Sequence, residues 1–272
     1  MRWSEAGLGG PPVVLLADCG SPSQTWAPVL PELAAHSRVV AYDRAGLGAS
    51  DPERSAGPTL ETPVGDLGAL VEHLDAGPAV LVGHGWGGLL AQLLAWQQPE
   101  LVAGLVLVDP AHEEFQPPAV RTADAVLLSL GLIREALAPA APGVTGAAPG
   151  AGGVGTGTAA GTVAVKVARR HQWRAALDEN RLAALAVPEL RSRRSAGRLP
   201  DVPVTVLSAS DGLPRALRER WTILQSRIAE GAVRGSHIVV RGAGHAVHTD
   251  QPEAVVAAVL EVVEHARQAR NA

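Results

Sequence analysis

The residues of this chain most relevant to chemistry are a histidine in a glycine-flanked loop and a glycine-rich turn with no side chain at its centre. His245 directly follows residues 242–244 in a predicted loop after a late strand. A histidine in such a loop is harder to explain by core packing than a histidine inside a strand. Histidine is the side chain most often used for proton transfer. Within residues 83–88, glycines crowd a turn whose central position is Gly85. Glycine has no side-chain oxygen or sulfur, so no covalent intermediate can form there.

The turn at Gly85 joins a strand to a helix. An apolar, β-branched run precedes it, and Leu89, Leu90, Leu93 and Leu94 follow with helical spacing. This pattern predicts a strand over residues 80–83 and a helix over residues 89–97 that ends before Pro99. Glycine tolerates a positive φ, so the turn can persist without its nucleophile.

The rest of the chain alternates short apolar runs with helical periodicity, which predicts a mostly parallel sheet with helices on both faces. A first edge strand is expected to be missing or reduced to residues 2–5. The predicted strands are residues 13–16, 39–43, 80–83, 102–108, 202–208 and 237–241, and helices are predicted around residues 26–33, 60–74, 89–97, 215–229 and 252–267.

The length of 272 residues favours one domain over residues 1–272. The α/β alternation lapses over residues 111–199, which predicts a lid insertion between core residues 1–110 and 200–272. Helical character is expected in residues 111–137 and 163–195. Residues 138–162 contain only Ala, Gly, Pro, Val and Thr, so we expect this segment to be flexible.

Composition excludes several classes of function. A net charge of −4 gives no basic footprint for nucleic acid, and no stretch is long enough to span a membrane. The single cysteine, Cys19, cannot form an internal disulfide, so a cytoplasmic protein is expected. Neither His112 with Glu113 and Glu114 nor His248 shows metal-ligand spacing, and no dinucleotide fingerprint is present, so no metal or cofactor is predicted.

Several segments, taken in order, resemble the α/β-hydrolase fold family of the AB hydrolase-1 type over nearly the whole chain. These are the loop before Thr25-Trp26, residues 42–48, the turn at 83–88, Asp109 at a strand end, and Gly244-His245 ahead of Gln251-Pro252. In that family the turn is Gly-x-Ser-x-Gly with a nucleophilic Ser at its apex. The resemblance implies the α/β-hydrolase fold, with Gly85 in the place of the Ser.

The resemblance also implies roles for individual residues. His245 takes the position of the catalytic base, and its acid is either Asp211, which has a slight lead by position, or Asp109. The backbone amides of Cys19 and Trp86 align with the oxyanion donors. Asp18 departs from the family pattern, because its carboxylate would oppose a developing negative charge. His84 is expected to be a structural neighbour of the turn.

We therefore expect a protein that acts on a small, largely apolar substrate by a non-covalent His-Asp general-base mechanism. Cys19 as a substitute nucleophile would come from the wrong loop for a triad. The alternatives are a catalytically dead hydrolase-fold protein that binds a ligand or a partner, and an engineered Ser-to-Gly change. The engineered change would leave Asp18 unexplained. Oligomeric state does not follow from the sequence.

Overall fold

A seven-stranded sheet forms the centre of the computed structural model, which describes residues 1–52, 59–115 and 159–271. The strand order is β1-β3-β2-β4-β5-β6-β7, and only β1 runs antiparallel to its neighbour. The predicted parallel sheet is confirmed, and the edge strand is short, as expected. The strands are β1 Arg2–Ala6, β2 Val13–Leu16, β3 Val39–Asp43, β4 Ala79–His84, β5 Val102–Val108, β6 Pro203–Ala209 and β7 Arg234–Val240.

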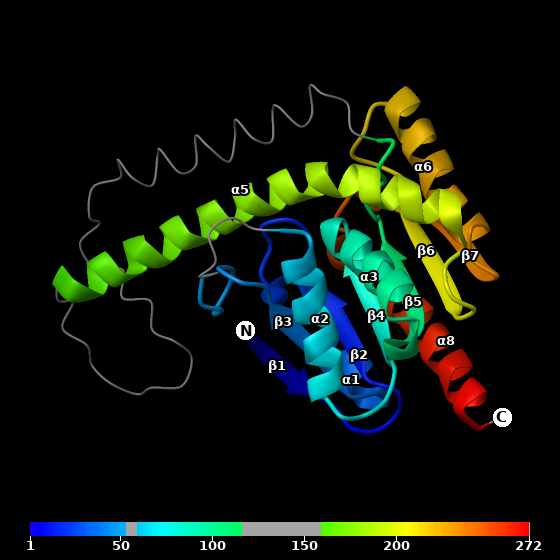
Figure 1. Ribbon diagram of the computed structural model, residues 1–272, viewed down its shortest axis with the longest axis horizontal. Coiled ribbons are helices and arrows are strands. Elements are labelled where there is room, and N and C mark those ends of the chain that lie inside the picture. The colour runs from blue at the N-terminus through cyan, green and yellow to red at the C-terminus, as the bar shows by residue number, and fades with distance from the viewer. Residues whose placement is uncertain (53–58, 116–158, 272) are drawn as a thin grey trace.

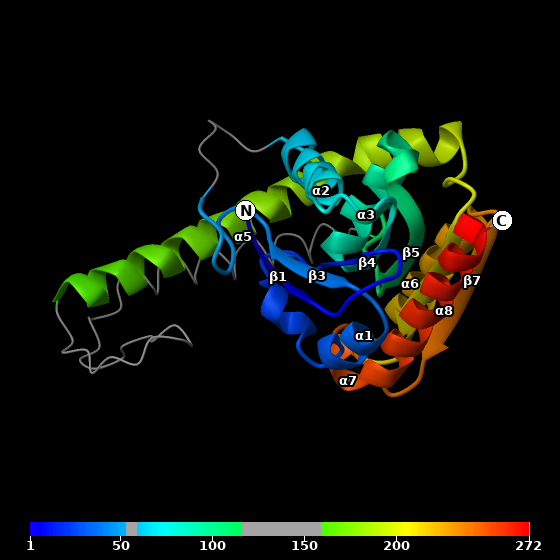
Figure 2. The same cartoon turned by 90° about the horizontal axis from the view of Figure 1, so that it is seen from below.

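Helices cover both faces of this sheet (Figures 1 and 2). Two hydrophobic clusters divide the helices, with α2, α3 and α6 on one face and α1 and α8 on the other. The central strands are buried on both faces, which explains their unbroken apolar runs. The helices are α1 Leu30–His36, α2 Glu61–His73, α3 Trp86–Gln97, α6 Arg215–Glu230, α7 Val247–Asp250 and α8 Pro252–Asn271, with 3-10 turns at Ser23–Trp26 and Pro99–Leu101.

One long helix, α5 (Ala159–Ala196), passes over α2 and α3, and its first half extends beyond the sheet (Figure 1). It confirms the helix predicted over residues 163–195 and begins at Ala159, inside the segment expected to be flexible. Residues 138–158 of that segment, and residues 116–137 of the other predicted helix, lie outside the described residues. The lid insertion and its boundaries stay a prediction.

Buried charge pairs fasten α5 to the core. Arg44, in the loop after β3, pairs with Glu179, and Arg194 pairs with Glu113 at 2.7 Å between Nε and Oε1. Arg194 also donates to Gln92 Oε1 at 3.2 Å. Arg194 therefore attaches the C-terminal part of α5 to the core.

The sheet register brings candidate site residues together at the carboxyl ends of the strands. Strands β4 and β5 pair in parallel with His84 opposite Val108, so Gly85 and Asp109 leave neighbouring strands side by side. Residues that follow β2 and β7 reach the same edge, as the contacts below show. Within residues 1–52, 59–115 and 159–271, no helix has the length and hydropathy that a bilayer crossing requires.

Candidate functional site

The turn between β4 and α3 keeps its sharp geometry with glycine at the apex. Gly85 has φ 51° and ψ −113°, its amide donates to Val108 O at 3.1 Å, and its carbonyl accepts from Gly88 N at 3.1 Å. A Cβ on Gly87 would lie 2.4 Å from Leu16 O, so this position must be glycine for α3 to approach β2. Helix α3 begins at Trp86, directly after the apex.

The carboxylate of Asp18 lies where a side chain on residue 85 would stand. A Cβ built on Gly85 would come within 2.0 Å of Asp18 Oδ1, which real atoms do not tolerate. The same oxygen accepts a hydrogen bond from the Trp86 amide at 2.7 Å. The amide predicted to stabilise an oxyanion therefore holds a carboxylate that belongs to the chain itself.

Asp109 is the buried acid of the site. Its Oδ2 lies 2.6 Å from His245 Nδ1, while its Oδ1 accepts from Trp221 Nε1 at 2.8 Å and from Gln225 Nε2 at 3.0 Å. Ala209 N donates to Oδ1 at 3.1 Å. Burial would raise the pKa of Asp109, but the bond to His245, the charge of that ring and these donors keep it below its usual range.

His245 lies between two carboxylates, because its Nε2 is 3.0 Å from Asp18 Oδ2. Burial would lower the pKa of His245, but the hydrogen bonds to Asp109 and Asp18 and their negative charges raise it to about 10. For Asp18, the cost of burial is outweighed by the bond from His245, the nearby His84 and the Trp86 amide, so its pKa falls. The ring and Asp18 thus hold one proton between them near neutral pH.

Two further histidines stand beside His245. His84, at the end of β4, donates through Nε2 to His245 O at 2.8 Å, and the two rings have centroids 4.5 Å apart. The His248 ring, from α7, lies 4.6 Å from the His84 ring and is 2% exposed. Burial lowers the pKa of His84, and it lowers that of His248 to about 4, so both rings are neutral near pH 7.

The other residues singled out by the sequence lie apart from the ring. Asp211 is exposed after β6 and bonds through its backbone amide to Ala243 O at 2.9 Å, so the geometry favours Asp109 as the acid. The Cys19 thiol contacts Ala176 O at 3.7 Å. From the loop of Asp18 and Cys19, the Asp18 carboxylate reaches His245. The use of the Cys19 amide as an oxyanion donor stays a prediction.

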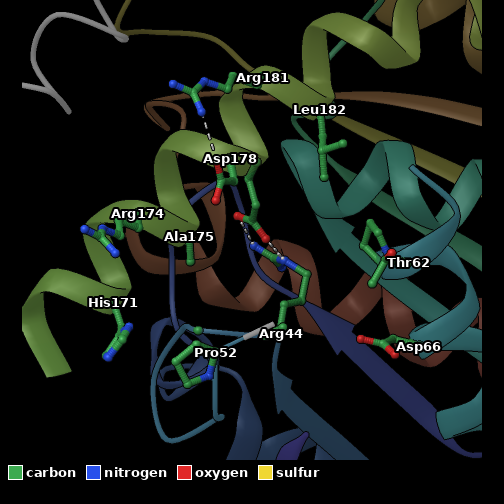
Figure 3. Close-up of a pocket in the computed structure, with 14 residues that line it drawn as sticks. Arg44, Pro52, Thr62, Asp66, His171, Arg174, Ala175, Asp178, Arg181 and Leu182 are labelled. Carbon is green, nitrogen blue, oxygen red and sulfur yellow. Dashed lines mark hydrogen bonds and ion pairs between the residues drawn. The ribbon is translucent and has the colours of Figure 1, made fainter. Parts of the chain in front are cut away.

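Helix α5 and Arg44 hold the Asp18 loop from behind. Arg44 donates to the carbonyls of Ala17 and Asp18, each at 2.7 Å, and Glu179 accepts from Gly20 N at 2.7 Å. Arg44 and Glu179 also lie at a cavity of about 500 Å³ between α5, α2 and the loop after β3 (Figure 3). Further charged side chains of α5, among them Arg174 and Asp178, also line this cavity.

The contact of Asp18 with His245 and the cluster of three histidines do not follow from any pattern in the sequence. His84 precedes the turn, and its expected structural role is compatible with its bond to the His245 carbonyl. His112 and Glu113, whose spacing predicts no metal site, are buried, at 2% and 3% exposed. The oddness of Asp18 was visible in the sequence, but no pattern linked it to a ring 227 residues away.

Comparison with known proteins identifies the family to which this fold belongs. The profile of the Alpha/beta hydrolase family matches residues 13–258. A Mycobacterium tuberculosis protein named as a non-heme bromoperoxidase, BpoC, is 43% identical over 101 residues, which are 36% of this chain and 38% of that protein. The chain thus aligns with little more than a third of this relative's length. Mouse epoxide hydrolase 4 is 34% identical over 110 residues, 39% of this chain and 30% of that protein.

Solved structures match over almost the full length. The crystal structure of BpoC from M. tuberculosis H37Rv has a TM-score of 0.67 at 25% identity and covers 97% of this chain and 96% of its own. An enol-lactonase from Burkholderia xenovorans, at 20% identity, shares the fold with a TM-score of 0.68, and the match covers 97% of this chain and 96% of that one. With a family profile matched over nine-tenths of its length, the chain belongs to the alpha/beta hydrolase family.

Proposed function

We propose that this protein is a hydrolase-type enzyme that activates water without a covalent intermediate, using His245, Asp109 and Asp18. The observation that carries the proposal is the unbroken chain of contacts from Asp109 Oδ2 through the His245 ring to Asp18 Oδ2, at 2.6 and 3.0 Å. A histidine held by a buried acid on one side and a proton partner on the other is equipped for general acid–base catalysis.

Each residue has a distinct part in this proposal. Asp109 fixes the orientation of the ring through Nδ1 and stabilises its charged form. Asp18 and His245 share one proton, so the Asp18 carboxylate can accept a proton from an attacking water while His245 Nε2–H donates one to the leaving group. Gly85 takes no chemical part, and its missing side chain leaves the space that Asp18 occupies.

A second candidate is a binding protein that has lost catalysis. One observation favours it, because Asp18 occupies both the Trp86 amide and His245 Nε2, the groups that an ordinary substrate carbonyl and nucleophile would need. The tight fit of Asp18 against Gly85 argues against an isolated, engineered Ser-to-Gly change, since residue 85 and Asp18 are matched to each other.

The partner we propose is a small molecule. Its expected apolar character came from the composition of residues 111–199, part of which lies outside the described residues. The cavity beside the Asp18 loop has a mixed lining, in which apolar Pro52, Pro63 and Leu182 stand among charged side chains. Relatives named for ester, lactone or epoxide substrates support small electrophiles as the first compounds to test.

The test is steady-state hydrolysis of p-nitrophenyl acetate by the full chain and by two matched variants. We expect turnover without a burst, because no acyl-enzyme forms. Asp109→Asn should lower kcat by about 100-fold or more, since the ring loses its charged partner. Asp211→Asn, an exposed carboxylate of the same edge, should stay within about twofold of the wild type.

A stoichiometric burst of nitrophenol would contradict the non-covalent mechanism. Equal losses in Asp109→Asn and Asp211→Asn, with both proteins folded by circular dichroism, would contradict the role of Asp109. Absence of turnover by the wild type across acetate, lactone and epoxide substrates would overturn the enzyme proposal in favour of the binding protein.

A further inference from the structure

We propose that Asp18, His84 and His245 bind one divalent transition metal ion of the zinc type, beside the turn whose apex is Gly85. Metal binding at these residues does not depend on the enzyme proposal. Use of the ion to activate water rests on that proposal and would replace proton transfer through Asp18 and His245, because both side chains are then ligands. The sequence spacing gave no such prediction, because the three residues come from three separate loops and strands.

The first argument is the donor set. One donor atom from each of the three side chains lies within 4.8 Å of the other two. Two imidazole nitrogens and one carboxylate oxygen are a set that zinc accepts in catalytic sites, which use three protein ligands and keep one position open. Donors in a tetrahedral site stand about 3.4 Å apart at bond lengths of about 2.0–2.1 Å. Small side-chain rotations would therefore close the site.

The second argument is that every ligand already has its other polar atom fixed. His245 has Nδ1 on Asp109 at 2.6 Å, and His84 has Nε2 on the His245 carbonyl at 2.8 Å. Asp18 has Oδ1 on the Trp86 amide at 2.7 Å. Metal-binding histidines characteristically donate their second N–H to a carboxylate or a backbone carbonyl, which sets the tautomer and aims the ring. Here both kinds of partner are in place.

The third argument concerns His84 itself. Because its Nε2 carries the proton donated to a carbonyl, its Nδ1 keeps a lone pair. The ring is buried, with 5% exposed. The His248 ring packs against it. The bond to the His245 carbonyl therefore fixes the ring and leaves its second nitrogen available to an ion.

Space and charge also suit a cation. The side chains of His245 and Asp18 are 52% and 24% exposed, so an ion can reach them from solvent. Asp18 and Asp109 together supply two negative charges against one divalent ion. A zinc-bound water has a pKa of about 7, so the ion would supply the nucleophile that the chain lacks.

The experiment titrates untagged, chelator-stripped full-length protein with Co²⁺, followed by its visible absorption, and with Zn²⁺ by calorimetry. Both are done at about pH 8, because protons compete for imidazole ligands. We expect one Co²⁺ per chain, with the intense bands of four- or five-coordinate cobalt, and displacement by Zn²⁺. Asp18→Asn and His84→Asn should each weaken binding by about 100-fold or more, and Asp109→Asn by about 10- to 100-fold.

His36→Asn is the matched control, because His36 is an exposed histidine on α1, and its affinity should equal that of the wild type. If His84→Asn does not fold, the Co²⁺ affinity of Asp18→Asn alone tests the proposal. The proposal is overturned if Co²⁺ gives no such bands, or if folded Asp18→Asn binds Co²⁺ as tightly as the wild type. Turnover that persists in the presence of chelator would support the acid–base proposal and show that the metal takes no part in it. Co²⁺ binding without turnover would support the metal site and contradict the enzyme proposal.

Discussion

At the scale of single residues, Gly85 and Asp18 are best understood as one feature. Glycine at the apex removes the side chain that would collide with Asp18, and Asp18 fills the space with a carboxylate that the Trp86 amide and His245 both recognise. The two residues are thus sterically matched to each other. A serine introduced at residue 85 alone should therefore not create a serine hydrolase.

The change Gly85→Ser tests this interdependence. The new Cβ would lie 2.0 Å from Asp18 Oδ1 at a φ of 51°, so we expect the free energy of unfolding to fall by about 1–3 kcal/mol. The variant should show no p-nitrophenyl acetate hydrolysis above that of the wild type. Urea unfolding and nitrophenol release measure the two effects.

The double variant Gly85→Ser/Asp18→Ala is the companion. Removing the Asp18 carboxylate makes room for the serine and frees the Trp86 amide, so the two changes should couple by about 1 kcal/mol or more. Hydrolysis with a burst should appear and should be lost with His245→Ala. Additive stability losses, or a burst already present in Gly85→Ser, would show that Asp18 does not block the position.

Residue type and spacing predicted much of this site but not its connections. Gly85 and His245 stood out because a glycine apex and a glycine-flanked histidine are chemically informative on their own. The choice between Asp109 and Asp211 could not be made, since each follows a strand of the same sheet. The structure distinguishes them by distance, because β5 lies beside β4 and carries Asp109 directly to the ring.

At the scale of elements, α5 secures the loop that presents Asp18. Glu179 on α5 pairs with Arg44, and both contact the backbone of residues 17–20. The helix itself followed from apolar periodicity, but its attachment did not, because periodicity says nothing about which charge a helix meets. Arg44 and Glu179 are separated by 135 residues.

Glu179→Ala should be among the more damaging single changes in α5. It would leave the Arg44 guanidinium, whose side chain is 4% exposed, without its carboxylate, and a broken buried pair costs about 3–5 kcal/mol. Urea unfolding gives the loss. Glu189→Ala is the matched control, because its pair with Arg193 is about 40% exposed and should contribute less than about 1 kcal/mol. Equal losses in the two variants would mean that α5 does not depend on the Arg44 pair.

At the scale of the whole molecule, the alternation of strands and helices follows from the sequence, because buried parallel strands read as unbroken apolar runs and amphipathic helices have a period of about 3.6 residues. The position of the candidate site follows from the topology, because the parallel strands β2, β4, β5 and β7 all have their carboxyl ends on that side of the sheet. The sequence does not predict that the His245 ring lies between the carboxylates of Asp109 and Asp18. That arrangement should make stability depend on pH in a defined direction.

The site should stabilise the fold most in mildly acidic solution. His245 has a folded pKa of about 10, above the value of about 6.5 expected when unfolded, so its contribution is complete below about pH 6.5 and is lost as pH rises toward 10. Asp18 and Asp109 have lowered pKa values, so their contributions hold above about pH 4 and are lost on acidification.

The measurement is the free energy of urea unfolding of chelator-treated wild type and Asp18→Asn across this range. Their difference should be greatest at about pH 5–6 and should shrink toward pH 10, where the ring is losing its proton in the wild type. Because the His245 side chain is 52% exposed, solvent screens the pair, and the change should be smaller than the pKa difference alone implies. Asp211→Asn should show no such trend. A difference that is constant with pH would mean that Asp18 holds the loop by its bond to Trp86 and not by its charge on His245.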